Sequence, residues 1–282
     1  MAHEVGDYRA RTIEAGTFRL DGGAMFGSVP RVLWERKLAP DALHRIPLAT
    51  RLLYLERRDG SGGVLVDTGN GQKWDEASRE QFAIEARSPG DWGIPLEKVT
   101  DLVLTHLHFD HAGGATHHGD SGKLEPTFPG ARVHVQRRNW EQAHAPWDRE
   151  RASYRAENFS PLDGPGLELH DGPGEILPGI HVEVVDGHTE GLQWLLVGQG
   201  AGAVAFPADL IPTSRHLHLP WIMGYDRCPR TTLDEKRGFL ERAADEGWIV
   251  VFEHDPDLPA ATVTRDARGR FVVADRVDLG GD

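Results

Sequence analysis

Three histidines and an aspartate fall within six consecutive positions of this 282-residue chain, and this cluster constrains the fold more than any other stretch. The four residues are His106, His108, Asp110 and His111, and they follow directly on the run Val99 to Leu104. That run is short and rich in β-branched and aliphatic residues, which predicts a buried strand. The cluster is therefore expected at the C-terminal end of a strand.

The spacing within the cluster indicates a site for two metal ions. His106 and His108 are two apart, so in extended backbone both imidazoles point to one side and can hold one ion. Asp110 and His111 are adjacent, so both can reach a second ion only if the chain turns. Gly113-Gly114 supplies the conformational freedom and the close approach of backbones that such a turn needs. With 15 His in the chain, chance fills three prescribed positions with a probability on the order of 10⁻⁴ per window. The interpretation of the three histidines as ordinary polar residues is thus disfavoured.

The segment His106-Leu107-His108-Phe109-Asp110-His111 resembles the H-x-H-x-D-H motif of the metallo-β-lactamase superfamily. Three further residues match the later ligands of that family in the same order, each after a strand-like run: His188, Asp209 and His254. The resemblance covers about residues 15 to 275. It implies an α/β protein with a four-layer αββα sandwich, whose metals lie at the edge of two facing sheets.

The resemblance also implies a role for each ligand candidate. The set consists of two triads and a bridge: His106, His108 and His188 for one ion, Asp110, His111 and His254 for the other, and Asp209 between them. Zinc is the expected metal in both positions, with manganese, iron or cobalt as alternatives, and a hydroxide bridging the ions would attack the substrate. Asp110 is the candidate catalytic residue, which relays a proton to the departing alkoxide. Asp67 is expected to orient the metal loop through hydrogen bonds, with a plain turn residue as the alternative.

Within the superfamily, the chain resembles the branch of quorum-quenching N-acyl-homoserine lactonases and methyl-parathion-hydrolase-like enzymes. Enzymes that open β-lactams typically have Cys where this chain has Asp209. Flavodiiron proteins have a Glu ligand and a flavin domain, and glyoxalase II adds a helical domain, whereas only residues 255 to 282 follow His254 here. We therefore expect a metal-dependent hydrolase that opens a lactone or ester. The alternatives are a phosphotriester hydrolase and a metal-binding scaffold without turnover.

Apolar and aromatic residues near the ligands are candidates for the substrate pocket: Met25, Phe26, Phe109, Trp221, Met223 and Tyr225. For Met25 and Phe26, core packing is the alternative. Some lactonases of this branch have a Tyr three residues after the bridging Asp, where this chain has Pro212, and Tyr225 is the candidate replacement. Such a pocket favours a neutral or weakly charged lactone with an apolar tail as the substrate.

Composition narrows the partners and the compartment. The chain has 31 Lys and Arg against 44 Asp and Glu, a net charge of −13, which is the wrong sign for holding phosphate backbones, so no nucleic-acid partner is expected. No basic start precedes an apolar stretch, and nowhere do eighteen apolar residues run together. We therefore expect a cytoplasmic protein without membrane contact. Cys228 is the only cysteine, which excludes an intrachain disulfide. Whether the protein forms a homodimer stays open.

No boundary divides the chain, so we expect one domain over residues 1–282. The segment 163–178 is rich in Pro and Gly and is expected to be a loop inside that domain. Periodicity predicts strands over 51–56, 64–68, 132–136, 180–185, 191–197, 203–206, 248–252 and 270–274. A helical region is expected to begin at Asn139, and Thr232 to Glu235 fits a capping box before a helix over 236–246. His117 and His118 are expected to be solvent-exposed.

Overall fold

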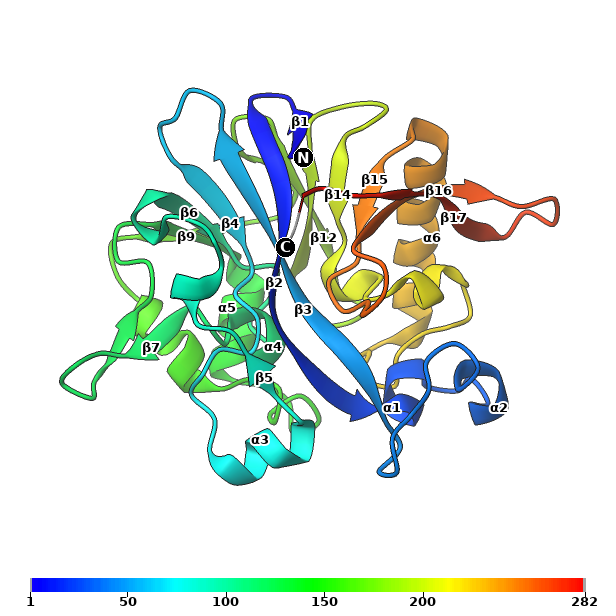
Figure 1. Cartoon of the computed structure of the whole chain (residues 1–282), viewed down its shortest axis with the longest axis horizontal. Helices are drawn as coiled ribbons and strands as arrows, with labels where there is room; N and C mark the ends of the chain where they lie inside the picture. The colour runs from blue at the N-terminus through cyan, green and yellow to red at the C-terminus, as the bar shows by residue number, and fades with distance from the viewer. Residues whose placement is uncertain (1, 281–282) are drawn as a thin grey trace.

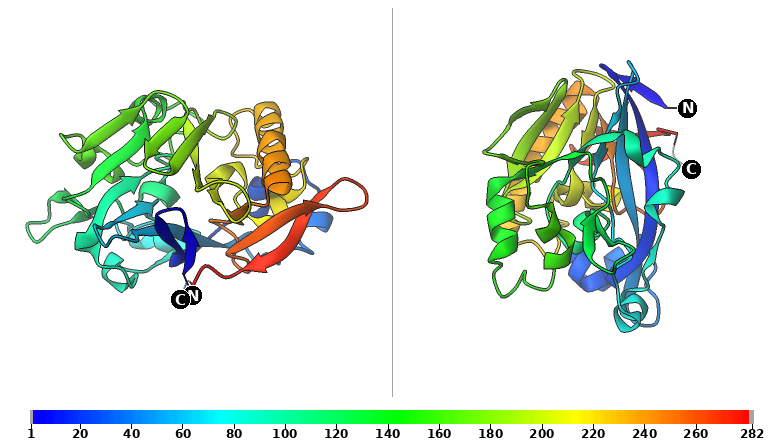
Figure 2. Two further views of the ribbon diagram at one scale, coloured as in Figure 1. Left: turned by 90° about the horizontal axis from the view of Figure 1, so that it is seen from above. Right: turned by 90° about the vertical axis from the view of Figure 1, so that its left-hand side faces the viewer.

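Two large β-sheets pack face to face in the computed structural model, which describes residues 2–280 (Figures 1 and 2). The first sheet has the order β1-β2-β3-β4-β6-β9-β10, with β5 paired to β2. Its strands are β1 (His3–Val5), β2 (Tyr8–Asp21), β3 (Arg45–Arg57), β4 (Gly63–Val66), β5 (Glu85–Ala86), β6 (Val99–Val103), β9 (Arg132–Gln136) and β10 (Leu167–His170). From β4 to β10 the neighbouring strands are parallel, so the C-terminal ends of β4, β6 and β9 meet at one edge.

The second sheet has the order β11-β12-β13-β14-β15-β16-β17. Its strands are β11 (Gly174–Leu177), β12 (Ile180–Val185), β13 (Leu192–Val197), β14 (Val204–Phe206), β15 (Ile249–Val251), β16 (Ala260–Arg265) and β17 (Phe271–Val277). Strands β14 and β15 pair in parallel and therefore end at the same edge. A small separate hairpin consists of β7 (Thr116–His118) and β8 (Leu124–Pro126).

Helices cover the outer faces of the two sheets. The α-helices are α1 (Gly22–Phe26), α2 (Arg31–Trp34), α3 (Glu76–Phe82), α4 (Phe109–Ala112), α5 (Arg137–His144) and α6 (Pro229–Glu246). Short 3₁₀ turns are η1 (Pro89–Asp91), η2 (Leu96–Lys98), η3 (Ala156–Asn158), η4 (Ser160–Leu162), η5 (Ala208–Leu210) and η6 (Ser214–Leu217). Trp140 of α5 packs on the first sheet, and Phe239 of α6 packs on Trp194 of the second. This is the expected αββα sandwich. No helix within residues 2–280 is long and apolar enough to cross a membrane.

Strand β3 shows how the sequence builds two cores at once. Leu53 and Leu55 point toward the second sheet and share a core with its Leu195. Leu52 and Tyr54 point the other way, into the core beneath α5. Side chains alternate between the faces of a strand, so a strand that is covered on both faces is apolar at nearly every position. The two cores hold the sheets, and hence their edges, in fixed relative positions.

The segment 163–178 is not a loop, contrary to the expectation from its sequence, because it contains β10 and β11. Strand β10 completes the first sheet and β11 starts the second, so the chain crosses between the sheets here, through Gly172 with φ 97°. Each of these strands is short and pairs with one neighbour only. Edge strands of this kind tolerate flanking Pro and Gly, which makes their sequence look like a loop.

The last helix also differs from the prediction of a helix over 236–246 with a capping box. Helix α6 begins at Pro229, a residue that suits the first helical position because the N–H it lacks has no partner there. The carboxylate of Glu235 accepts hydrogen bonds from the backbone N–H groups of Asp186 (2.7 Å) and Gly187 (3.0 Å). The capping box is therefore wrong: Glu235 joins α6 to the loop that follows β12.

Candidate metal centre

The ends of neighbouring strands place the motif at one edge of the sandwich. After β6, Thr105 donates from its backbone N–H to Asp67 Oδ1 (2.8 Å) and from its hydroxyl to Asp67 Oδ2 (2.6 Å). These bonds fix the start of the metal loop against the end of β4. The turn that the sequence required after His108 is the single helical turn α4, whose first residues include Asp110 and His111. The turn lets adjacent side chains reach a common point.

Three imidazole nitrogens from both sheets form the first ligand group. His106 Nε2 lies 3.0 Å from His108 Nδ1, and His108 Nδ1 lies 3.2 Å from His188 Nε2. Asp209 Oδ2 is 3.1 Å from His188 Nε2. Donors at about 2.0–2.1 Å from a tetrahedral zinc ion are about 3.3 Å from one another. The spacing of this group therefore fits one ion.

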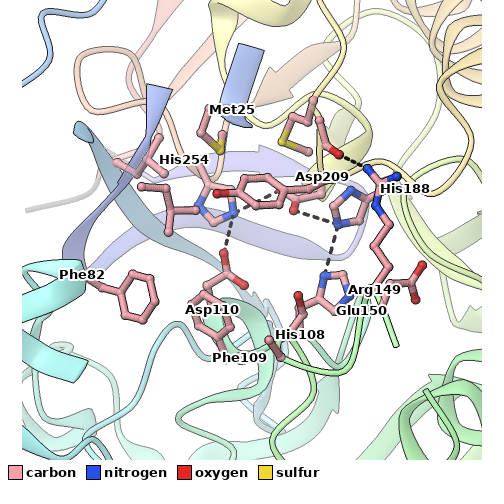
Figure 3. Close-up of a pocket in the computed structure, with 17 residues that line it drawn as sticks. Met25, Phe82, His108, Phe109, Asp110, Arg149, Glu150, His188, Asp209 and His254 are labelled. Carbon is pink, nitrogen blue, oxygen red and sulfur yellow. Dashed lines mark hydrogen bonds and ion pairs between the residues drawn. The ribbon is translucent and has the colours of Figure 1, made fainter. Parts of the chain in front are cut away.

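Asp110, His111 and His254 form the second ligand group. The Nε2 atoms of His111 and His254 are 3.2 Å apart, and the Asp110 carboxylate lies 3.8 Å from His254 Nε2. Asp209 Oδ1 is 3.2 Å from His254 Nε2, so the two oxygens of Asp209 face the two groups (Figure 3). That oxygen is buried and accepts no hydrogen bond from residues 2–280. A buried acceptor without a donor is suited to a cation.

Most of these histidines are held by a partner at their outer nitrogen. The contacts are His106 Nδ1 with Thr105 Oγ1 (3.1 Å), His111 Nδ1 with Asp67 Oδ2 (3.0 Å), His188 Nδ1 with Asp226 Oδ1 (2.8 Å) and His254 Nδ1 with the Ala49 carbonyl (2.8 Å). Only His108, at Nε2, has no such partner among the described residues. An acceptor at the outer nitrogen fixes the ring and its tautomer, which leaves the inner nitrogen free to bind a metal.

Burial and neighbouring charges set the protonation of the centre. Burial, together with the surrounding imidazoles, holds the pKa of His106 and of His108 well below the usual range. Burial also disfavours charge on His188 and His254, but Asp209 opposes it and raises their pKa values to about 10 and about 9. Despite burial, these histidines hold the pKa of Asp209 well below its usual value. The centre thus attracts positive charge, and the donor set fits divalent metal ions.

A cavity of about 270 Å³ opens onto both ligand groups. Its lining residues fall into an apolar set, Leu20, Met25, Leu48, Phe82, Phe109 and Met223, and a second set, Arg149, Glu150, Ala152, Ser153, Gly224 and Tyr225. In Figure 3, Phe82 and Arg149 lie on opposite sides of the ligands. The cavity therefore has an apolar side and a more polar side.

Four of the six predicted pocket residues line this cavity: Met25, Phe109, Met223 and Tyr225. The expectation for Phe26 and Trp221 needs correction. Phe26 is fully buried and stacks on Trp34 and His216, with ring centroids 5.6 Å and 5.1 Å apart, while Trp221 meets its edge. Adjacent residues of a helix point in different directions, so Met25 faces the cavity while Phe26 supports its wall from behind.

Among the lining residues that sequence reasoning missed, Arg149 and Glu150 are the two that carry charge. Arg149 donates to the carbonyl of Gly224 across the cavity mouth. Glu150 is buried, and its Oε2 accepts from Gln142 (3.0 Å) and Thr189 (3.2 Å). The only signal in the sequence is a run of four charged residues of alternating sign, 148–151, inside an aromatic-rich segment without periodicity. His117 and His118, by contrast, are exposed on β7, as expected.

Comparison with known proteins agrees with this geometry. The family model of the Metallo-beta-lactamase superfamily matches residues 52–254. A probable metallo-hydrolase of Mycobacterium tuberculosis is 29% identical in an alignment of 251 positions that covers 76% of each chain. An N-acyl homoserine lactonase of Bacillus cereus is 26% identical in an alignment of 238 positions that covers 77% of this chain and 85% of the lactonase. The solved structure of AidC, a dizinc quorum-quenching lactonase, has a TM-score of 0.75 at 20% identity and covers 99% of this chain and 98% of its own.

The matched segment runs from β3 to His254 and so includes every ligand candidate. Both buried ligand groups lie within it, at the edge where the strands of the two sheets end. The chain therefore belongs to the metallo-β-lactamase superfamily and is a hydrolase that depends on divalent metal.

Proposed function

We propose that the protein is a two-metal lactonase whose substrate carries an apolar tail. The observation that carries this proposal is the position of Asp209. Its two carboxylate oxygens face two separate ligand groups, 3.1 Å from His188 and 3.2 Å from His254, at the foot of a cavity with an apolar side. The B. cereus relative and AidC, both named as lactonases, favour the same reaction class.

In this proposal the ligand groups hold one ion each: His106, His108 and His188 the first, Asp110, His111 and His254 the second, with Asp209 shared. Two such ions would lower the pKa of a bound water to about 7 and polarise the substrate carbonyl. We propose zinc in both positions, because imidazole and carboxylate donors suit it. Asp110 faces the cavity and carries the proton to the departing ring oxygen. Asp67 keeps the His111 ring in place.

The cavity favours a neutral substrate with an apolar tail. Among the described residues, Arg149 is the only Lys or Arg that lines it, so it offers no cluster of cations for a polyanion. Met25, Phe109 and Met223 can bury an acyl chain and exclude water. Each buried methylene contributes about 0.8 kcal/mol, which corresponds to up to about fourfold in kcat/KM per added methylene until the cavity is full.

The test uses metal-replete enzyme and a matched panel of acyl-homoserine lactones of increasing chain length, aryl esters, a phosphotriester and a phosphodiester. We expect two ions per chain and a kcat/KM that rises with acyl length. Met25→Ala should weaken that rise, while Leu43→Ala, at an exposed position, should leave it unchanged. Fastest turnover of the phosphotriester would support an organophosphate hydrolase instead. Two bound ions without any turnover would support a scaffold.

A further inference from the structure

A second buried carboxylate faces His111, and the proposed chemistry does not use it. Glu253 lies directly before His254, and its side chain is fully buried. Its Oε2 is 3.1 Å from His111 Nδ1, and Asp67 Oδ2 is 3.0 Å from the same nitrogen. Two carboxylates therefore face a single imidazole nitrogen, on the side of the ring away from the other ligands.

The two carboxylates differ in their hydrogen bonds. Both oxygens of Asp67 accept from Thr105. Neither oxygen of Glu253 accepts a hydrogen bond from residues 2–280. Burial raises the pKa of the Glu253 carboxyl, because an ionised buried carboxylate without donors is costly unless positive charge lies close by. A structural carboxylate would be expected to have donors, as Asp67 does.

The nearest buried guanidinium does not supply that charge through direct contact. Arg51 donates to the carbonyls of Phe252 (2.6 Å) and Asp255 (2.9 Å) and to the carboxylate of Glu14 (2.6 Å). None of these bonds involves the Glu253 side chain. The positive charge that fits is on the side of His111, where the second ligand group would hold its ion.

The carboxylates are distributed unequally between the two ligand groups. The group of His111 contains Asp110 as a direct ligand and has Asp67 and Glu253 behind its imidazole. Among the outer nitrogens of the other group, only that of His188 meets a carboxylate, Asp226, within the described residues. Asp209 contacts both groups, at 3.1 Å from His188 Nε2 and at 3.2 Å from His254 Nε2. Because a divalent cation is attracted by every nearby negative charge, this distribution favours tighter binding in the group of His111.

We propose that Glu253 makes the position of Asp110, His111 and His254 the tighter of the two, so that it fills first and releases its ion last. The inference rests on the proposed two-metal centre. Glu253 does not line the cavity, so it acts through His111 and through its charge, as a positioning residue rather than a catalytic one.

The experiment compares the two stepwise metal affinities of the full chain and its variants. Metal-free protein is titrated with Zn²⁺ in competition with a chromophoric chelator, which needs no turnover. Glu253→Gln keeps the shape and removes the charge, and we expect it to weaken the tighter ion by about 10–100-fold while the weaker one changes less than about threefold. Asp226→Asn should do the reverse. Glu253→Asp keeps the charge, so its affinity for the tighter ion should fall less than that of Glu253→Gln.

The matched control is Asp101→Asn, another buried carboxylate, whose partners include Arg57 (2.7 Å) and His134 (3.1 Å) rather than a ligand. It should leave both affinities unchanged. Two outcomes would overturn the inference: both affinities unchanged in Glu253→Gln, or equal losses in Glu253→Gln and Glu253→Asp, which would indicate a role in shape alone. Saturation of the unmodified protein at one ion would instead contradict the proposed two-metal centre.

Discussion

At the scale of single residues, the centre depends most on Asp209, which lies in the 3₁₀ turn η5 directly after β14. We expect Asp209→Ala to lose both ions and to lower turnover by about 100-fold or more, because two close cations would lose the negative charge between them. Elemental analysis of metal-replete protein and kcat/KM measure the two effects. His117→Ala and His118→Ala, at exposed positions, should change neither. The ligand assignment would be refuted if either histidine variant lost metal while Asp209→Ala still bound it.

The pH dependence of metal binding follows from the same residues. In metal-free protein the pKa values of His188 and His254 are raised to about 10 and about 9, so both rings carry a proton at neutral pH. Bound metal needs the neutral ring. Metal binding near pH 7 should therefore release protons, and the apparent affinity should increase as the pH rises from about 7 toward about 9. Calorimetric titration in buffers of different ionisation enthalpy measures the release. A heat that is independent of the buffer would contradict this prediction.

The ligands could be predicted from the sequence because each follows a strand and belongs to a dense pattern of His and Asp. The supporting residues could not. A charged residue such as Arg149, Glu150 or Glu253 has no distinguishing pattern in the sequence, and it becomes informative only when its burial and its neighbours are known. Phe26 shows the same limit, because hydrophobicity predicts burial but not which side of a cavity wall the ring occupies.

At the scale of elements, the loop after β4 packs closely on the chain after α4, and the two backbones touch at Gly71 and Gly113. A Cβ at Gly71 would lie 2.0 Å from the Gly113 carbonyl oxygen. Gly113 itself has an ordinary helical φ of −59°. The sequence suggested two reasons for glycine there, conformational freedom and close approach of backbones, and only close approach applies to Gly113. Only glycines allow this contact, and it adds to the hydrogen bonds that Thr68 and Lys73 donate to the carbonyls of His111 and Gly113.

Gly71→Ala should therefore disturb the metal loop. Gly122→Ala is the matched control, because Gly122 also has a positive φ, 75° against 62° for Gly71, but has nothing within 4 Å of an added Cβ. Backbone strain of about 1–2 kcal/mol is expected in both. Only Gly71→Ala should in addition lower the metal affinity. Chemical denaturation and Zn²⁺ titration measure the two effects, and equal behaviour of the variants would show that the close contact is unimportant.

Strand β12, which alternates apolar and other residues, and β15, which is a short continuous apolar run, were predictable, whereas β10 and β11 were not. Their pairing in two different sheets is a tertiary property. The start of α6 was missed because Glu235 satisfied the capping pattern, although its carboxylate binds the backbone of Asp186 and Gly187 instead. Local sequence patterns identify an element reliably only where its side chains bind neighbours in the sequence rather than a distant segment of the folded chain.

At the scale of the whole molecule, the ligands come from both sheets: His106 to His111 follow β6 of the first, and His188, Asp209 and His254 follow strands of the second. Removing metal should therefore lower the stability of the entire sandwich. At a free metal concentration of about 100 times Kd, each ion contributes about 2.7 kcal/mol, so chelation should lower Tm by about 5 °C per ion. Differential scanning calorimetry measures this, and an unchanged Tm would argue against ligation across the sheets. That residues 1–282 form one domain stays a prediction.

Ligation across the sheets also changes the connectivity of the chain. An ion held jointly by Asp110 and His254 closes a ring that includes every residue between them, as a disulfide would, in a protein whose one cysteine, Cys228, has no partner in the sequence. The ion is bound by the folded chain only, so this ring closes as the chain folds and opens as it unfolds. A chelator then acts on this protein as a reductant acts on a disulfide-linked one: it opens the ring reversibly, and restoring the metal closes it again.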